Sequence, residues 1–104
     1  MSQEARKKRH YKIMLVRRVV GRSMTPILDP GQVVVAIPWR RYQAEDVVLL
    51  SHQGKEKIKR IRMIDSKSGK YDVRGDNPSQ STDSRHFGLI EHADIVGKVI
   101  WPWV

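Results

Sequence analysis

Lys57-Ile58-Lys59-Arg60-Ile61-Arg62-Met63-Ile64 is the stretch that decides how the rest of this sequence is interpreted. Side chains of a β-strand point alternately to the two faces of a sheet, so Lys59, Ile61 and Met63 share one face. The opposite face carries Ile58, Arg60, Arg62 and Ile64. The stretch predicts a strand and, if the first face is the inner one, a lysine that lies among apolar groups.

Short apolar runs separated by turn residues surround this strand. They predict further strands at 32–37, 45–50, 71–74 and 94–101, and at residues 12–20 either one strand or two short ones broken around Arg17-Arg18. Turns are expected at residues 27–31, 52–55 and 66–70, and a short helical turn at 91–94. Many short strands with frequent turns favour a mainly β fold, with a small antiparallel sheet that is folded over or barrel-like.

Length and composition limit the organisation of the chain. A chain of 104 residues fits one domain, expected at residues 12–104, after a basic and flexible tail at residues 1–11. No cysteine is present, which excludes disulfides, thiolate metal sites and a cysteine nucleophile. No apolar run approaches the roughly 20 residues of a spanning helix, and no signal peptide is recognisable. These features predict a cytoplasmic protein, with a position at the membrane periphery as the alternative.

The net charge of +9 favours anionic partners such as nucleic acid, a lipid surface or an acidic protein. Basic residues cluster in Arg6-Lys7-Lys8-Arg9, Arg17-Arg18, Arg40-Arg41 and along residues 55–62. A solvated basic surface and a mobile tail explain them better, because no aromatic-rich basic strand of the RNA-binding type is present. Nucleic acid is therefore an unlikely partner, and weak association with anionic membranes stays open.

Two stretches carry residues suited to acyl-transfer chemistry. Gly21-Arg22-Ser23-Met24-Thr25-Pro26 follows a short apolar run and can hold the Ser23 hydroxyl at an exposed turn. Burial of an ammonium group lowers its pKa, so a buried Lys59 could accept a proton near neutral pH. A serine nucleophile needs such a base. The simpler interpretation of each residue alone is a turn serine and a surface lysine.

Three blocks in this order resemble the type I signal peptidase family of serine–lysine proteases. The first is Ser23-Met24-Thr25-Pro26 with Pro30-Gly31, and the second is Ile58-Lys59-Arg60-Ile61. The third block, residues 75–88, holds Gly75-Asp76-Asn77, Ser81-Thr82-Asp83-Ser84-Arg85 and Gly88. The resemblance covers roughly residues 19–99. Related self-cleaving repressor proteases share the first block but lack the third.

The resemblance implies a role for each matching residue. Ser23 would be the nucleophile, with its backbone N–H as an oxyanion donor, Lys59 the general base and Ser81 the residue that orients the lysine. Met24, Arg60, Asp76, Asp83 and Arg85 would support the site structurally, with Arg60 paired to Asp76. Some relatives carry a serine two residues before the nucleophile as a second oxyanion donor, but this position is Gly21 here. The resemblance implies neither a metal nor another cofactor.

The chain departs from the family in two respects. Signal peptidases are membrane-anchored, and larger bacterial members carry an insertion between the second and third blocks, where only residues 61–74 lie here. The departures favour a small soluble maturation protease, similar to those that trim the N-terminal extension of nickel-type superoxide dismutase. The substrate would be a protein or peptide in an extended conformation.

Several alternatives remain open. The chain could be a membrane-associated signal peptidase relative that cleaves exported preproteins, or a non-catalytic basic β domain that binds nucleic acid. A serine–histidine–aspartate triad through Ser23 is also conceivable. However, His10, His52, His86 and His92 fall outside the first two blocks and show no zinc-ligand spacing. The sequence leaves substrate, cleavage site, second oxyanion donor and oligomeric state undetermined.

Overall fold

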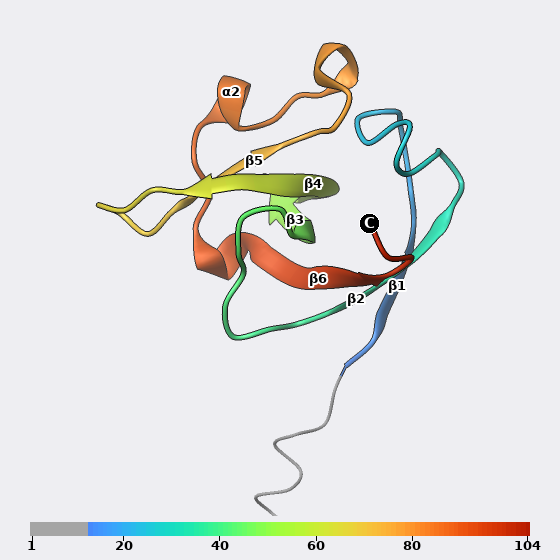
Figure 1. The fold of residues 1–104 in the computed structure, drawn as a ribbon, viewed down its shortest axis with the longest axis horizontal. Coiled ribbons are helices and arrows are strands. Elements are labelled where there is room, and N and C mark those ends of the chain that lie inside the picture. The colour runs from blue at the N-terminus through green and yellow to red at the C-terminus, as the bar shows by residue number, and fades with distance from the viewer. Residues whose placement is uncertain (1–12) are drawn as a thin grey trace, which may run out of the picture.

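The computed structural model describes residues 13–104 and contains one six-stranded antiparallel sheet (Figure 1). Its strands are β1 (Leu15–Arg18), β2 (Val33–Ile37), β3 (Val47–His52), β4 (Lys55–Ile64), β5 (Tyr71–Arg74) and β6 (Ile95–Trp101). They lie in the order β1-β2-β6-β3-β4-β5. The predicted mainly β, antiparallel fold is confirmed. The predicted tail and the start of the predicted domain at Lys12 lie outside the described residues.

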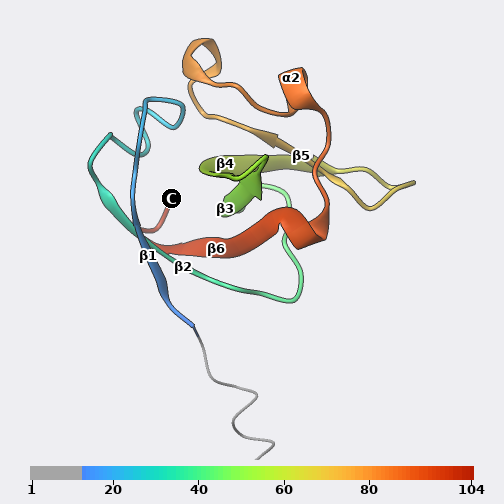
Figure 2. The ribbon, with the colours of Figure 1, turned by 180° about the vertical axis from the view of Figure 1, so that it is seen from behind.

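The sheet is folded over rather than closed into a barrel. Its edge strands are β1 and β5, which do not pair with each other in the described part of the chain. In both ribbon views β4 and β5 lie above β3, while β2 and β6 lie below it (Figures 1 and 2). Arg17 of β1 nevertheless reaches Glu56 of β4, with Nε 2.7 Å from a carboxylate oxygen. The fold thus brings the Ser23 segment, which follows β1, opposite β4.

β3 forms the centre of the core because both of its faces are buried. Val47 and Leu49 pack into one apolar cluster together with Met24, Leu28 and Val34. On the other face, the neighbouring side chains of β3 join a second cluster, which contains Val48, Leu50, Ile61, Tyr71, Val73 and Ile90. Period-two alternation along one strand therefore supports two cores.

The tight β3–β4 hairpin supplies the long strand that carries Lys59. Its two turn residues, Gln53 and Gly54, have φ values of 52° and 77°. Positive φ at both positions is typical of a type I′ turn, whose twist matches that of the flanking strands. The resulting register places Lys59 directly opposite Val48. The hairpin predicted at residues 52–55 is confirmed.

β1 is a single strand that is continuous over Arg17 and ends at Arg18, which is one of the two forms predicted for this segment. One detail of the prediction for β4 is wrong. On β4, Lys59 and Ile61 are buried as the alternation predicts, but Met63 is 44% exposed. The β4–β5 register shifts between Ile61 and Met63, and such a bulge changes the direction of the side chains that follow it.

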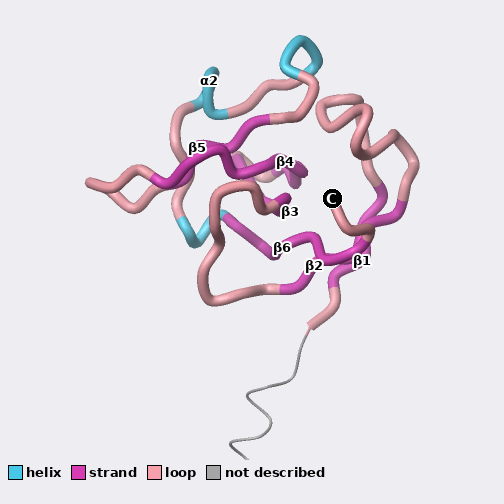
Figure 3. Tube along the Cα trace, in the orientation of Figure 1, coloured by secondary structure: helices cyan, strands magenta, loops and turns pink. Residues whose placement is uncertain are grey.

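Helical structure is confined to short segments in the connections between strands, and these helices appear cyan in Figure 3. The predicted turn at residues 91–94 is the 3₁₀ helix η2 (His92–Asp94). Two short helices in the third block were not predicted, namely η1 (Pro78–Gln80) and α2 (Ser84–Phe87). They fold the block back across β5. Within residues 13–104, the helices are too short to cross a membrane.

Candidate active site

The Ser23 turn is anchored at both ends. The Val19 N–H donates to the Gln32 carbonyl at 2.8 Å, and the Gly31 N–H donates to the Val19 carbonyl at 2.8 Å. Gly21 has φ +79°, a conformation that glycine adopts without the steric cost of a Cβ. Met24 is buried in the core cluster of Leu49 and Val34. This anchoring leaves the neighbouring Ser23 side chain at the wall of a cavity.

Lys59 is the buried cation of this region, with 4% of its surface exposed. Its Nζ donates a hydrogen bond of 3.0 Å to Ser81 Oγ. Burial lowers the pKa of the Lys59 amine; attraction to Asp83 opposes this effect, whereas repulsion from Lys57 and Arg85 adds to it. The net direction brings the amine closer to accepting a proton at neutral pH.

Ser81 is fixed by three hydrogen bonds. Its hydroxyl accepts from Lys59 Nζ and, at 3.2 Å, from the Gly75 N–H, and it donates to Asp83 Oδ2 at 2.6 Å. A hydroxyl has one donor and two acceptor positions, so all of its capacity is used. Because the Ser81 proton goes to Asp83, Ser81 presents a lone pair to Lys59. The Lys59 amine therefore points one N–H at Ser81. Its remaining hydrogen-bonding positions are left for groups in the cavity.

Asp83 is fully buried beneath Ser81. Burial alone would raise the pKa of its carboxyl, but hydrogen bonds from Arg85 and Ser81 and from the Gly75 and Arg85 backbone N–H groups outweigh burial. The pKa therefore lies well below its ordinary value. Arg85 contributes Nε at 2.9 Å and Nη2 at 3.0 Å. Asp83 is thus a charged anchor that also caps α2.

The start of the third block docks directly on the Ser23 turn. The Asn77 N–H donates to the Ser23 carbonyl at 2.8 Å, and Asn77 Nδ2 donates to Thr25 Oγ1 at 2.7 Å. Thr25 and Asn77 belong to the first and third blocks, but the resemblance implied no role for either residue. Sequence patterns do not identify a contact between positions that lie so far apart in the chain.

Arg60 and Asp76 hold the third block to β4. Arg60 donates to the carboxylate of Asp76 through Nε at 3.0 Å and Nη2 at 2.9 Å. The hydrogen bond to Asp76 is the largest cause of the raised pKa of Arg60. A two-pronged arginine–carboxylate pair restricts direction as well as distance. Arg60 follows Lys59 along the chain, but neither Arg60 nor Asp76 lines the cavity.

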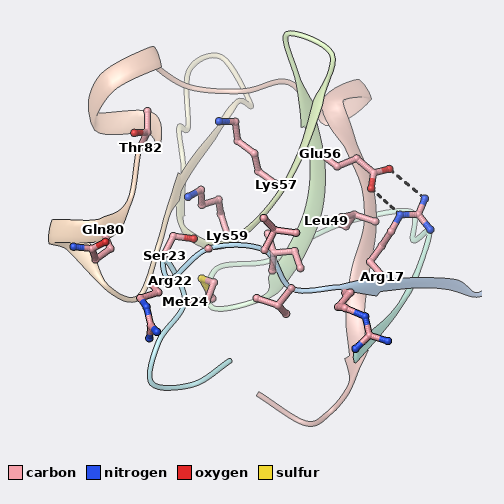
Figure 4. Close-up of a pocket in the computed structure, with 15 residues that line it drawn as sticks. Arg17, Arg22, Ser23, Met24, Leu49, Glu56, Lys57, Lys59, Gln80 and Thr82 are labelled. Atoms are coloured by element: carbon pink, nitrogen blue, oxygen red, sulfur yellow. Dashed lines mark hydrogen bonds and ion pairs between the residues drawn. The ribbon is translucent and has the colours of Figure 1, made fainter. Parts of the chain in front are cut away.

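A cavity of about 320 Å³ is lined by residues of all three blocks. Its walls include Ser23 and Met24 from the turn, Lys59 from β4, and Gln80 and Thr82 from the third block (Figure 4). Ser81, Asp83, Arg60, Asp76 and Arg85 do not line it. Among the described residues, no hydrogen bond joins Ser23 and Lys59. Such contacts are often long in the absence of substrate.

The histidines lie elsewhere. His52 stacks on Phe87 with ring centroids 4.2 Å apart, and His92 packs against Tyr42. His86 Nδ1 accepts from the Asp83 N–H. None of the three described histidines lines the Ser23 cavity, which argues against a triad of Ser23 with any of them. His10 lies outside the described residues. Among residues 13–104, no group of three metal-binding side chains comes together.

Gly75 leaves no room for a side chain. A Cβ placed there would lie 2.5 Å from the Ser23 carbonyl oxygen and would collide with Ser81. We expect Gly75→Ala to destabilise the fold by about 1–3 kcal/mol, as overpacking does, and to lower any activity that depends on Ser23. Urea denaturation measures the first effect.

Gly69→Asn serves as the control for this substitution. Gly69 has φ +75°, a Cβ added there would meet no atom within 4 Å, and asparagine tolerates this conformation. The control should be close to wild type in stability. If Gly75→Ala were equally harmless, the close packing of Gly75 against Ser23 and Ser81 would be contradicted.

Comparison with known proteins finds similarity to signal peptidases in the C-terminal part of the chain. Residues 64–104 match the family described as signal peptidase, peptidase S26. Signal peptidase IB of Staphylococcus aureus strain Mu50 / ATCC 700699 is 58% identical over 38 residues, which are 34% of this chain and 20% of that protein. The proteins of the same name from strains N315 and MW2 give the same values.

These matches show similarity to signal peptidases over the C-terminal part of the chain. The signal-peptidase-like segment contains β5, β6 and the third block with Ser81, Asp83 and Arg85. It begins after Ser23 and Lys59, so the match does not extend to these two residues. The aligned part spans one fifth of the length of the curated relatives.

Proposed function

We propose that this chain is a serine endopeptidase in which Ser23 is the nucleophile and Lys59 the general base. One observation carries the proposal. Lys59 is a buried lysine with a lowered pKa in the wall of the cavity that also contains Ser23. A perturbed titratable group beside a nucleophile in a cleft is a physical indication of a functional site. The signal-peptidase-like third block, which supplies Ser81, agrees with it.

In this reaction the neutral Lys59 amine takes the Ser23 proton as Oγ attacks the substrate carbonyl carbon. The Ser23 N–H, which has no acceptor in the described part of the chain, donates to the oxyanion. Lys59 then gives its proton to the leaving amine as the peptide bond breaks. A water molecule, deprotonated by Lys59, hydrolyses the Ser23 ester and returns both groups to their starting state.

An extended substrate fits the free edge of β4. Residues 55–59 pair with β3 on one side, whereas β5 pairs only with residues 60–64. Every second N–H and C=O of this segment therefore faces away from β3, beside the cavity. Addition of a substrate strand at such an edge is a common mode of peptide recognition. It would pass the scissile bond between Ser23 and Lys59.

We further propose that the substrate is a protein with a removable N-terminal pro-segment or leader. The sequence resemblance to small maturation proteases favours the extension of nickel-type superoxide dismutase, processed in the cytoplasm without a metal or other cofactor in the enzyme. Incubation with that precursor and with an exported preprotein would compare this substrate with the signal-peptidase alternative.

Ser23→Ala is the direct test of the nucleophile. We expect this variant to keep its fold and to lose cleavage, because no other hydroxyl replaces Ser23 in the reaction. The measurement is mass spectrometry of the new N-termini that the wild type generates in a mixture of candidate precursors and library proteins. Thr82→Val, which alters another cavity hydroxyl, is the control. Unchanged cleavage by Ser23→Ala would contradict the proposal.

A further inference from the structure

The cavity beside Ser23 carries an unbalanced charge. Its lining contains one acidic side chain, Glu56, and five basic ones, namely Arg17, Arg18, Arg22, Lys57 and Lys59. The acidic side chain is already occupied, because Arg17 donates to both of its oxygens at 2.7 and 3.2 Å. The remaining cations therefore set the electrostatic character of the cavity.

Two of these cations are available to a ligand. Arg18 donates to the Gly31 carbonyl and Lys59 to Ser81. Arg22 and Lys57 have no carboxylate partner in the described part of the chain, and Lys57 rests 5.7 Å from the centre of the Phe87 ring. Figure 4 shows Lys57 above and Arg22 below, with Lys59 and Ser23 between them. Two positive charges that no described carboxylate neutralises thus flank the proposed reaction centre.

A peptide fits this cavity better than a nucleic acid does. Single-stranded nucleic acids bind by stacking their bases on aromatic side chains, and no aromatic residue of the described part of the chain lines the cavity. The unpaired edge of β4 instead offers backbone hydrogen bonds to an extended peptide. Carboxylates near the scissile bond of that peptide would meet Arg22 and Lys57.

We propose that this cleft selects protein substrates with aspartate or glutamate close to the scissile bond, and that Arg22 and Lys57 are the residues that recognise this charge. The inference rests on the proposed function and adds a substrate class to it. Both side chains reach the cavity from exposed or half-buried positions, so the attraction weakens as salt screens it.

The test uses Ser23→Ala, so that binding is measured without turnover. Three short capped peptides, otherwise composed of alanine and serine, carry two glutamates, two glutamines or two lysines around their centre. Calorimetry at low salt should give an affinity about fivefold or more higher for the glutamate peptide than for the glutamine peptide, since exposed ion pairs contribute modestly. The lysine peptide should bind weakest, and high salt should reduce the preference.

Variants then locate the preference. Adding Arg22→Gln and Lys57→Gln to Ser23→Ala should remove it, whereas Lys67→Gln with Lys70→Gln, in a turn remote from the cavity, should leave it intact. Equal affinities for the glutamate and glutamine peptides would overturn the inference. So would an equal loss of the preference for the glutamate peptide in the Lys67→Gln and Lys70→Gln control. Tighter binding of oligothymidylate through Arg22 and Lys57 would also overturn it. The proposed function is tested separately: cleavage by Ser23→Ala would contradict it, whatever the peptide affinities are.

Discussion

Lys59→Met should abolish proteolysis while the protein remains folded. Methionine has nearly the volume of lysine but cannot accept a proton, so Ser23 would lose its base. General-base catalysis contributes roughly 10²–10⁴-fold, and we expect a loss of about a thousandfold or more in kcat/KM. The measurement is the rate of cleavage of whichever precursor the wild type processes, with circular dichroism to verify the fold.

Lys57→Met is the matched control, because Lys57 lies two residues away on the same face of β4 and is not assigned a chemical step. It should retain far more turnover at saturating substrate than Lys59→Met. Normal cleavage by Lys59→Met would remove the lysine from the mechanism. A loss of fold in this variant would be visible in the denaturation curve and would call for Lys59→Gln instead.

The same substitution should change the dependence of stability on pH. A lysine whose pKa is lowered on folding binds fewer protons in the folded than in the unfolded state. Stability then rises with pH between the folded and unfolded pKa values. The loss of stability that comes from burying the charged Lys59 amine is largest below the folded pKa. Lys59→Met should therefore stabilise the protein more at neutral than at strongly alkaline pH. Denaturation midpoints at several pH values measure this difference.

Asp83→Ala should cause the largest loss of stability. The change removes a fully buried carboxylate, which leaves the Ser81 hydroxyl without its acceptor and takes one acceptor away from the Gly75 N–H and from the Arg85 guanidinium. Breaking one partner of a buried, hydrogen-bonded ion pair costs about 3–5 kcal/mol. Urea denaturation should show this loss, and activity should fall with it because Ser81 no longer has a fixed orientation toward Lys59.

The difference in stability between wild type and Asp83→Ala should depend on pH, because the pKa of Asp83 is lowered in the folded protein. The stabilisation is fully present above the unfolded pKa, about 4 for aspartate, and is lost as pH falls toward the folded value. Wild type and Asp83→Ala should therefore converge in acid. Asp29→Ala, at an exposed turn, should change stability by no more than about 0.5 kcal/mol. Equal costs at the two positions would contradict the anchoring role of Asp83.

Local patterns in the sequence were sufficient to predict most strands. The alternation in β4 and the turn residues at Gln53-Gly54 specify a hairpin, and burial agrees with the predicted inner face at Lys59 and Ile61. Alternation alone does not select that face, because basic residues occupy both faces of the strand. The family resemblance supplied the choice. Met63 departs from the predicted inner face because a bulge precedes it, and the position of this bulge depends on the pairing of β4 with β5.

Long-range features were beyond the reach of sequence patterns. The position of β6 between β2 and β3 depends on pairing between distant segments. The short helices η1 and α2 contain too few residues for helical periodicity to be recognisable. The contact of Asn77 with Thr25 spans 52 positions, and the exclusion of a side chain at Gly75 depends on the Ser23 carbonyl. Such features arise only when the whole sheet is assembled.

Titration of the Lys59 amine tests the central claim most directly. Lysine labelled with ¹³C at Cε reports the protonation of each amine by NMR, and the signal missing in Lys59→Met assigns the relevant one. We predict that Lys59 titrates clearly below the ordinary lysine value of about 10.4, as burial requires. Titration of Lys59 at its ordinary value would contradict its proposed role as the base for Ser23.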